Sequence, residues 1–202
     1  MKLFYSPGAC SQSPHIALRE AGLAFDLVKV DLRAKKTDGG DDFSAINPKG
    51  YVPALLLDNG QLLTEGPAIV QYIADQNPES ALAPKNGTLE RYRLQEWLNF
   101  ISTELHKSFS PLFNPDMVEA GKAVYRARLL DRFKWVDAQL EAKPYTMGEN
   151  FSVADAYLFV VSGWGQYVGV DLSGLKNLQA FLGRVAARPA VQEAMKAEGL
   201  LK

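Results

Sequence analysis

Hydrophobic and polar positions follow one pattern before about residue 80 and a different one after it. In the first part, short apolar or alternating runs, which are typical of strands, are interleaved with helical spacing. The predicted strands are 2–5, 25–30, 52–57 and 62–63, and the predicted helices are 11–21 and the segment from 66 onward. Asn59-Gly60 predicts a hairpin turn before the last strand, because both residues tolerate positive φ. This order, β-α-β followed by β-β-α, predicts an α/β unit with a mixed sheet.

The second part is predicted to be helical almost throughout. Apolar residues recur at helical spacing over 89–105, 124–140, 152–168, 175–187 and 190–197. The stretch at 78–87 is rich in Pro, Ala, Asn and Gly, which indicates a linker. We therefore expect an α/β domain at 1–80, a linker at 81–86 and an all-helical domain at 87–202. Within the first domain, 31–48 is expected to be an irregular connection with one short helix near Phe43.

Composition narrows the possible classes of function. The 202 residues are 47% hydrophobic and 22% charged, with a formal net charge of −1, which favours neither nucleic acid nor an anionic membrane as a partner. No apolar run approaches the roughly 20 residues that cross a bilayer, and Pro7 and Gly8 interrupt the start, so we expect no secretory signal. One cysteine and two scattered histidines give no zinc spacing. The single cysteine suits a reducing, cytoplasmic environment.

Cys10 follows a predicted strand and turn and precedes a predicted helix. Backbone N–H groups and the dipole at a helix N-terminus stabilise a thiolate, so we expect a reactive thiol here rather than a small buried hydrophobe. In Cys10-Ser11-Gln12-Ser13 a resolving cysteine is missing. The thiol could therefore attack, form a mixed disulfide, or activate a bound thiol by hydrogen bonding.

Other features of the first domain leave structural and functional interpretations open. Pro53 opens a predicted strand, where it could follow a cis peptide bond beside a binding site or simply mark an edge strand. Thr64 or Glu65 could cap the next helix. Alternatively, the Glu65 carboxylate could hold an ammonium while the helix N–H groups hold a carboxylate. Lys35 is either solvated or a partner for a ligand carboxylate.

In the helical domain, Asn99, Thr103 and His106 recur at spacings of three to four and would share a helical face. His106 has aromatic neighbours, which suggests a helix end beside an apolar cleft, and its imidazole could stabilise a nearby thiolate. Ser152 and Asp155 form a variant capping box, with Asp155 as a buried or half-buried acceptor. His15, on the first predicted helix, is expected to pack or cap locally.

Five segments in one order closely resemble those of a glutathione S-transferase of the bacterial beta class. They are Cys10, Asn47-Pro48-Lys49-Gly50-Tyr51-Val52-Pro53-Ala54-Leu55, Leu63-Thr64-Glu65-Gly66, Glu104-Leu105-His106-Lys107 and Ser152-Val153-Ala154-Asp155-Ala156-Tyr157. The resemblance runs from Met1 to near Lys202. It implies a thioredoxin-like N-terminal domain, a helical C-terminal domain and a homodimer.

The resemblance also implies a set of roles. Glutathione is the co-substrate, no metal is required, and Cys10 and His106 lie near the glutathione sulfur. The implied glutathione-binding residues are Cys10, Lys35, Val52 through its backbone, Pro53 in cis form, Glu65, Gly66, Asn99, Thr103, His106 and Lys107. Candidate walls for the electrophile are Phe109, Phe113 and Trp164. Many relatives activate glutathione with the hydroxyl of a Tyr or Ser near the N-terminus. Tyr5 and Ser11 are therefore alternatives to Cys10 for this role.

The expected function is therefore cytoplasmic detoxification by attack of the glutathione thiolate on a small, largely apolar electrophile. One alternative is a thiol transferase or peroxidase that works through a Cys10–glutathione mixed disulfide. Another is a non-catalytic protein that binds apolar ligands.

Overall fold

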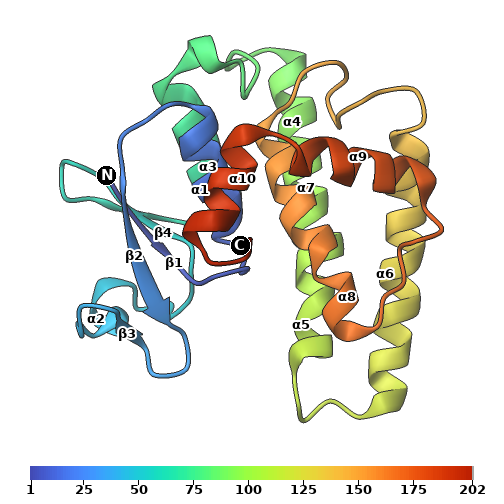
Figure 1. Cartoon of the computed structure of the whole chain (residues 1–202), viewed down its shortest axis with the longest axis horizontal. Coiled ribbons are helices and arrows are strands. Elements are labelled where there is room, and N and C mark those ends of the chain that lie inside the picture. The colour runs from blue at the N-terminus through green and yellow to red at the C-terminus, as the bar shows by residue number, and fades with distance from the viewer. Residues whose placement is uncertain (202) are drawn as a thin grey trace. The chain divides into compact units, whose positions relative to one another are not determined.

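The computed structural model describes residues 1–201 and divides into two compact units (Figure 1). The first unit comprises Met1–Ala83 together with the segment from Arg188 onward, and the second comprises Pro84–Ala187. Of the helices within residues 1–201, none is both long enough and apolar enough to span a membrane.

The first unit is built on a five-stranded mixed sheet with strand order β3-β2-β1-β4-β5. Only β1 and β2 pair in parallel; the remaining neighbours are antiparallel. The strands are β1 (Lys2–Tyr5), β2 (Asp26–Asp31), β3 (Lys36–Thr37), β4 (Ala54–Leu56) and β5 (Leu62–Thr64). Sequence pattern predicts four of these strands and misses β3, because two residues of a polar connection carry no alternation.

Helices cover this sheet and fix the loop that follows β1. They are α1 (Gln12–Glu20), α2 (Phe43–Ile46), α3 (Gly66–Gln76), the 3₁₀ turn η1 (Pro78–Ser80) and α10 (Pro189–Ala197). Helix α1 packs against both α3 and α10. One core cluster joins Phe4 of β1, Val30 of β2, Phe43 of α2, and Val52 and Ala54 at β4. The short helix expected near Phe43 is thus present and buries its aromatic ring.

The C-terminal segment differs from expectation, because the structure groups it with the first unit rather than with the helical domain predicted at 87–202. The reason lies in two buried or half-buried polar contacts. Arg188 forms a bidentate pair with Glu20 of α1, at 2.6 and 2.8 Å. The buried Glu198 carboxylate accepts hydrogen bonds from His15 Nδ1 at 2.8 Å and from the Gly8 N–H at 3.0 Å. Helical spacing predicts α10 but not the unit against which it packs.

The second unit is entirely helical. Its elements are α4 (Leu89–Phe100), η2 (Ile101–His106), α5 (Lys107–Phe113), α6 (Glu119–Gln139), α7 (Val153–Gly163), α8 (Gly165–Val168) and α9 (Lys176–Ala186). Helix α7 is buried along almost its whole length and packs against α4, η2 and α9. A helix that is apolar on all sides belongs in a core, and α7 forms the centre of this unit. The helix predicted at 89–105 instead continues through a π-helical stretch, η2, into α5.

Candidate functional site

Cys10 lies in the turn between β1 and α1, and its half-buried Sγ donates a hydrogen bond to the Val52 carbonyl at 3.3 Å. Burial raises the pKa of the thiol to about 12. The backbone N–H groups of Cys10 and Ser11 lower this pKa, and the charge of Glu65 raises it, but burial outweighs both. Cys10 therefore keeps its proton at pH 7 in the protein without a ligand, which is the state that the hydrogen-bonding role requires.

Several N–H groups at the start of α1 are already paired, so they add nothing to the lowering of the thiol pKa by the Cys10 and Ser11 N–H groups. The N–H groups of Gln12, Ser13 and His15 donate to backbone carbonyls of the preceding turn, at 3.0, 3.1 and 3.3 Å. Pro14 has no N–H to offer. The sequence places the thiol correctly at the helix start but does not reveal how the first-turn donors are paired.

Tyr5 and Ser11 carry the two hydroxyl groups that could take the place of the Cys10 thiol, and both side chains are buried. Ser11 is buried, and its Oγ donates to the Ser6 carbonyl at 3.2 Å and accepts from the Ser6 N–H at 3.1 Å. Tyr5 is also buried, and burial, followed by the charge of Glu198, raises its phenol pKa. Ser11 therefore closes the loop that carries Cys10, and Tyr5 is a neutral phenol at pH 7.

Val52 contacts Cys10 within the first unit, and Gly66 lies near Pro53, the residue that follows Val52. The Val52–Pro53 peptide bond is cis, one of the two conformations that the sequence left open for Pro53. Gly66 begins α3, and a Cβ at this position would lie 3.9 Å from Pro53 Cγ. The structure thus brings together a thiol, a backbone carbonyl and the start of a helix.

Glu65 adopts φ of 70° and ψ of 113°, a conformation that non-glycine residues seldom adopt. Glu65 stands at the N-cap of α3, but its side chain makes no capping hydrogen bond. Instead, Glu65 Oε1 accepts from Lys49 Nζ at 2.6 Å and from the Tyr51 hydroxyl at 2.7 Å. Lys49 Nζ also donates to Thr64 Oγ1 at 3.0 Å. Sequence reasoning missed both partners of Glu65, although they stand in the Asn47–Leu55 motif, because residues about fifteen positions apart meet only when β4 and β5 pair.

Lys35 lies near the same turn as Lys49 and Tyr51. Its backbone is left-handed, with φ of 55°, and its exposed Nζ donates to the Gly50 carbonyl at 2.5 Å. Lys35 and Lys49 therefore place two ammonium groups around the segment that leads into the cis peptide bond. Ammonium groups so placed can bind ligand carboxylates.

His106 ends η2 in the second unit and is surrounded by aromatic side chains. Its Nδ1 lies 2.5 Å from the Tyr157 hydroxyl, and its ring packs edge-on against Trp164 with a centroid distance of 4.8 Å. Burial, followed by the charge of Lys107, lowers the pKa of His106 to about 4. The imidazole is therefore neutral at pH 7. Sequence reasoning missed Tyr157 as its partner.

The three candidate wall residues meet beside His106. Trp164 lies 5.6 Å from Phe109 and 6.2 Å from Phe113, measured between ring centroids. Phe109 is fully buried, whereas Phe113 is 52% exposed. Within this cluster Phe109 is therefore held inside the unit, and Phe113 is accessible to solvent.

Asn99, Thr103 and Lys107 are exposed on the same helical rod as His106. Thr103 Oγ1 donates to the Asn99 carbonyl at 3.0 Å. The π-helical hydrogen bonding of 101–106 widens the turn, so the α-helical spacing that aligns these residues on one face does not hold across it. π-Helical turns occur often at functional sites.

Ser152 and Asp155 form the expected capping box at the start of α7. The buried Asp155 carboxylate accepts from the Ser152 N–H at 2.8 Å, from Ser152 Oγ at 2.7 Å and from the Thr146 N–H at 2.7 Å. Asp155 therefore fixes the preceding loop as well as the helix start. Across residues 1–201, no group of three or more His, Cys, Asp or Glu side chains is arranged to hold a metal ion.

Comparison with known proteins decides the family. Residues 8–76 match the N-terminal domain family of glutathione S-transferases, and residues 100–189 match the C-terminal domain family. The chain is 52% identical over 200 residues to glutathione S-transferase GstA of Escherichia coli O157:H7, covering 99% of this chain and 100% of the relative. The chain belongs to the glutathione S-transferase family.

Two solved structures of this family extend the comparison. The bacterial beta class glutathione S-transferase of Sphingomonas chungbukensis has a TM-score of 0.97, 55% identity and complete coverage of both chains. A sphingomonad glutathione S-transferase complexed with glutathione has a TM-score of 0.96, 52% identity and the same coverage. The resemblance inferred from five ordered segments is confirmed, as is the glutathione S-transferase fold.

Proposed function

We propose that this glutathione S-transferase ionises bound glutathione and directs its sulfur at small, largely apolar electrophiles. The observation that carries the proposal is the contact between Cys10 Sγ and the Val52 carbonyl, next to Gly66 and Glu65. A thiol, a peptide carbonyl and a carboxylate in one unit complement a peptide that carries its own thiol, amides and ammonium group.

Charge supports the assignment of the binding residues. Glutathione carries two carboxylates and one ammonium group at pH 7. The Glu65 carboxylate, held by Lys49 and Tyr51, would receive the ammonium of the γ-glutamyl end, and Gly66 at the start of α3 would face its carboxylate. Lys35 would pair with the other carboxylate. The backbone of Val52 would exchange hydrogen bonds with the peptide between these ends.

Cys10 would act as a hydrogen-bond donor rather than as the nucleophile. Because its pKa is about 12, it keeps its proton at pH 7, and its S–H can turn from the Val52 carbonyl to donate to a glutathione thiolate. A free thiol has a pKa of about 8.5, and each unit of lowering corresponds to about 1.4 kcal/mol of preferential thiolate stabilisation. The thiolate would then form a C–S bond to the electrophilic carbon, and the leaving group would depart with its bonding electron pair.

The second unit supplies the remaining proposed roles. Phe109, Phe113 and Trp164 offer an apolar surface for the electrophile, and the neutral His106 adds no charge beside it. The proposal also includes Asn99, Thr103, His106 and Lys107 in glutathione binding, on the strength of the family resemblance. Detoxification in the cytoplasm by a homodimer belongs to the same proposal.

Kinetics with a chloronitroaromatic acceptor test this function. We expect glutathione-dependent turnover in the wild type, reduced turnover in Cys10→Ala because a donor to sulfur is lost, and intermediate turnover in Cys10→Ser. Ser13→Ala is the matched control, since it removes a hydroxyl that bonds the Cys10 carbonyl but leaves the thiol in place. Absence of turnover across a broad panel of electrophiles would reject the proposal.

The alternative through a mixed disulfide has a separate test. It requires a Cys10 thiolate, which a pKa of about 12 disfavours. Mass spectrometry after treatment with oxidised glutathione should therefore find little adduct at pH 7. Rapid and complete adduct formation, with no conjugation, would favour thiol transfer. Tight binding of apolar ligands without any turnover would favour a binding protein.

A further inference from the structure

The His106 ring packs against two aromatic side chains of α7, the buried helix at the centre of the second unit. Tyr157 lies in the second turn of α7, and Trp164 is the C-cap of the same helix. The ring centroid of His106 is 5.8 Å from that of Tyr157 and 4.8 Å from that of Trp164, and both contacts are edge-on. Tyr157 is 2% exposed, and its hydroxyl lies 2.5 Å from His106 Nδ1. One core helix therefore fixes both neighbours of the imidazole.

The hydrogen bond between Tyr157 and His106 determines which ring nitrogen carries the proton. Because the imidazole is neutral at pH 7, one of its nitrogens is a donor and the other is an acceptor. A phenol is a stronger acid than a neutral imidazole, and an imidazole nitrogen is a stronger base than a phenol oxygen, so the hydroxyl donates and Nδ1 accepts. The proton of the ring is therefore on Nε2.

His106 Nε2 can reach a ligand. Within residues 1–201 it forms no hydrogen bond with the protein, and Thr146 Oγ1 is the only enclosed side-chain polar atom there that lacks a partner. The Nε2–H group is therefore open to solvent. It stands beside the aromatic cluster of Trp164, Phe109 and Phe113. A few fixed polar groups in an apolar surface orient the ligand that packs on it.

We propose that Tyr157 is a positioning residue that holds His106 as the Nε2–H tautomer, so that this N–H donates to an oxygen of the electrophile. This role rests on the proposed function and names its substrate class, electrophiles in which a nitro or carbonyl group is conjugated with the attacked carbon. As the glutathione sulfur forms the C–S bond, a π electron pair of the substrate moves onto that oxygen, where the Nε2–H stabilises the negative charge. In a chloronitroaromatic the pair then returns to the ring and expels chloride; in an enone the neighbouring carbon takes a proton from solvent.

Nitrogen-15 NMR of the ring nitrogens tests the tautomer directly, because the chain has only two histidines. His15 is an internal reference of the opposite kind. Arg19 Nε donates to His15 Nε2 at 2.9 Å, and an arginine cannot accept, so the His15 proton is on Nδ1 and faces Glu198. At pH 7 we expect His106 to be protonated at Nε2 and His15 at Nδ1. A proton on His106 Nδ1 would overturn the proposal.

Tyr157→Phe removes the hydroxyl and keeps the ring. The two nitrogen shifts of His106 should move towards each other in this variant, because nothing then holds one tautomer, while those of His15 stay unchanged. Unchanged His106 shifts would show that Tyr157 does not set the tautomer, and would overturn the proposal as well.

Kinetics with two electrophiles test the role of the donor. The chloronitroaromatic has a conjugated nitro group, whereas benzyl chloride has no acceptor oxygen. Tyr157→Phe should lower kcat for the chloronitroaromatic about three- to tenfold, the size of one hydrogen bond, with the KM for glutathione unchanged. Turnover of benzyl chloride should stay within about twofold of the wild type. Equal losses with both electrophiles would overturn the assignment of the donor to a substrate oxygen.

Substitutions of His106 itself separate a donor at Nε2 from one at Nδ1. Glutamine places an amide N–H near the position of Nε2, and asparagine places one near Nδ1. His106→Gln should therefore retain more chloronitroaromatic turnover than His106→Asn, and the reverse order would overturn the proposal. Absence of turnover in the wild type would reject the proposed function and the donor role with it, whereas the NMR result does not depend on turnover.

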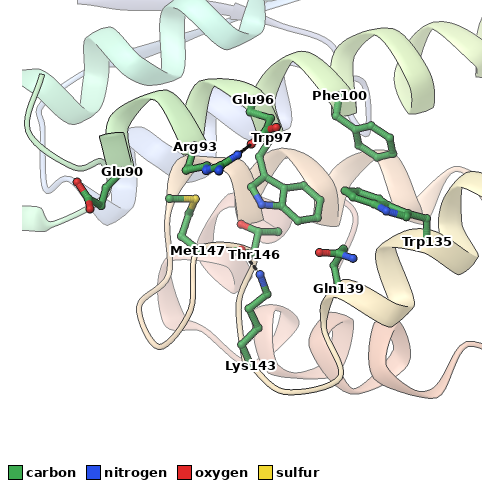
Figure 2. Close-up of a pocket in the computed structure, with 10 residues that line it drawn as sticks. All are labelled: Glu90, Arg93, Glu96, Trp97, Phe100, Trp135, Gln139, Lys143, Thr146 and Met147. Atoms are coloured by element: carbon green, nitrogen blue, oxygen red, sulfur yellow. Dashed lines mark hydrogen bonds and ion pairs between the residues drawn. The ribbon is translucent and has the colours of Figure 1, made fainter. Parts of the chain in front are cut away.

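Two control variants measure general effects on the second unit. Tyr167→Phe removes a phenol hydroxyl from α8, where the side chain is 71% exposed. Trp135→Phe alters a different aromatic cluster, in which Trp135 packs against Trp97 and Phe100 along a separate crevice of the second unit (Figure 2). Both controls should keep the wild-type ratio of turnover between the two electrophiles. A change of that ratio as large as in Tyr157→Phe would overturn the specific role of Tyr157.

Discussion

Burial of Cys10 predicts how fast its thiol reacts with an alkylating reagent. Moving its pKa from 9.0 to about 12 lowers the thiolate fraction at pH 7 about a thousandfold. A more basic thiolate is also more nucleophilic, and a Brønsted coefficient of about 0.4–0.5 over three pKa units returns roughly 16- to 32-fold. The native thiol should therefore react with iodoacetamide about 30- to 60-fold more slowly than the same thiol in the unfolded chain.

Because Cys10 is the only cysteine, the urea-unfolded protein is an internal reference for this comparison. Pseudo-first-order rates should be measured from pH 6 to 11 in both states. The native rate should keep rising about tenfold per pH unit throughout, whereas the unfolded rate should level off near 9. A native rate above the unfolded rate at pH 7, or a native plateau with a midpoint below pH 9, would refute the argument that burial controls this thiol.

The remaining predictions concern charge and buried hydrogen bonds. His106 should show no charging in an NMR titration between pH 8 and 5.5, because its pKa is about 4. The stability that the neutral ring contributes should be complete above pH 6.5 and lost as the pH falls towards 4. An NMR inflection near pH 6.5 would contradict this. Asp155→Ala leaves two buried N–H groups unpaired and should lower the free energy of unfolding by about 2–4 kcal/mol in urea melts, with a smaller loss in Asp155→Asn. Glu198→Ala should cost about 2–4 kcal/mol in the same assay, because His15 Nδ1 loses its buried acceptor; an unchanged melt would reject this role.

Sequence patterning predicts the order of elements well where local signals are strong. The run at 2–5, the Asn59-Gly60 turn and the capping box at Ser152 each lie where the structure has β1, the β4–β5 hairpin and the start of α7. These signals depend on residues close together in the chain. By contrast, the partner of α10 depends on Glu198 meeting His15 across 183 positions, which no local period encodes.

The same contrast between local signals and long-range contacts holds for the candidate site. The motif around Val52 and the resemblance point to the residues that adjoin Cys10, but the protonation state of the thiol depends on burial. Burial is a property of the folded loop, so a position at a helix N-terminus does not by itself determine whether the thiol is ionised. The face shared by Asn99 and His106 also depends on the helix type, and the π-helical stretch at 101–106 leaves no mark in apolar spacing.

The central claim is that the protein binds glutathione and lowers the pKa of its thiol. Ultraviolet difference titration of the thiolate absorbance tests it directly, because Cys10 titrates near 12 and leaves the region below pH 10 to the bound ligand. The account predicts that bound glutathione ionises at least about one unit below the pKa of about 8.5 typical of a free thiol. Titration at the free value, or absence of saturable glutathione binding, would contradict it.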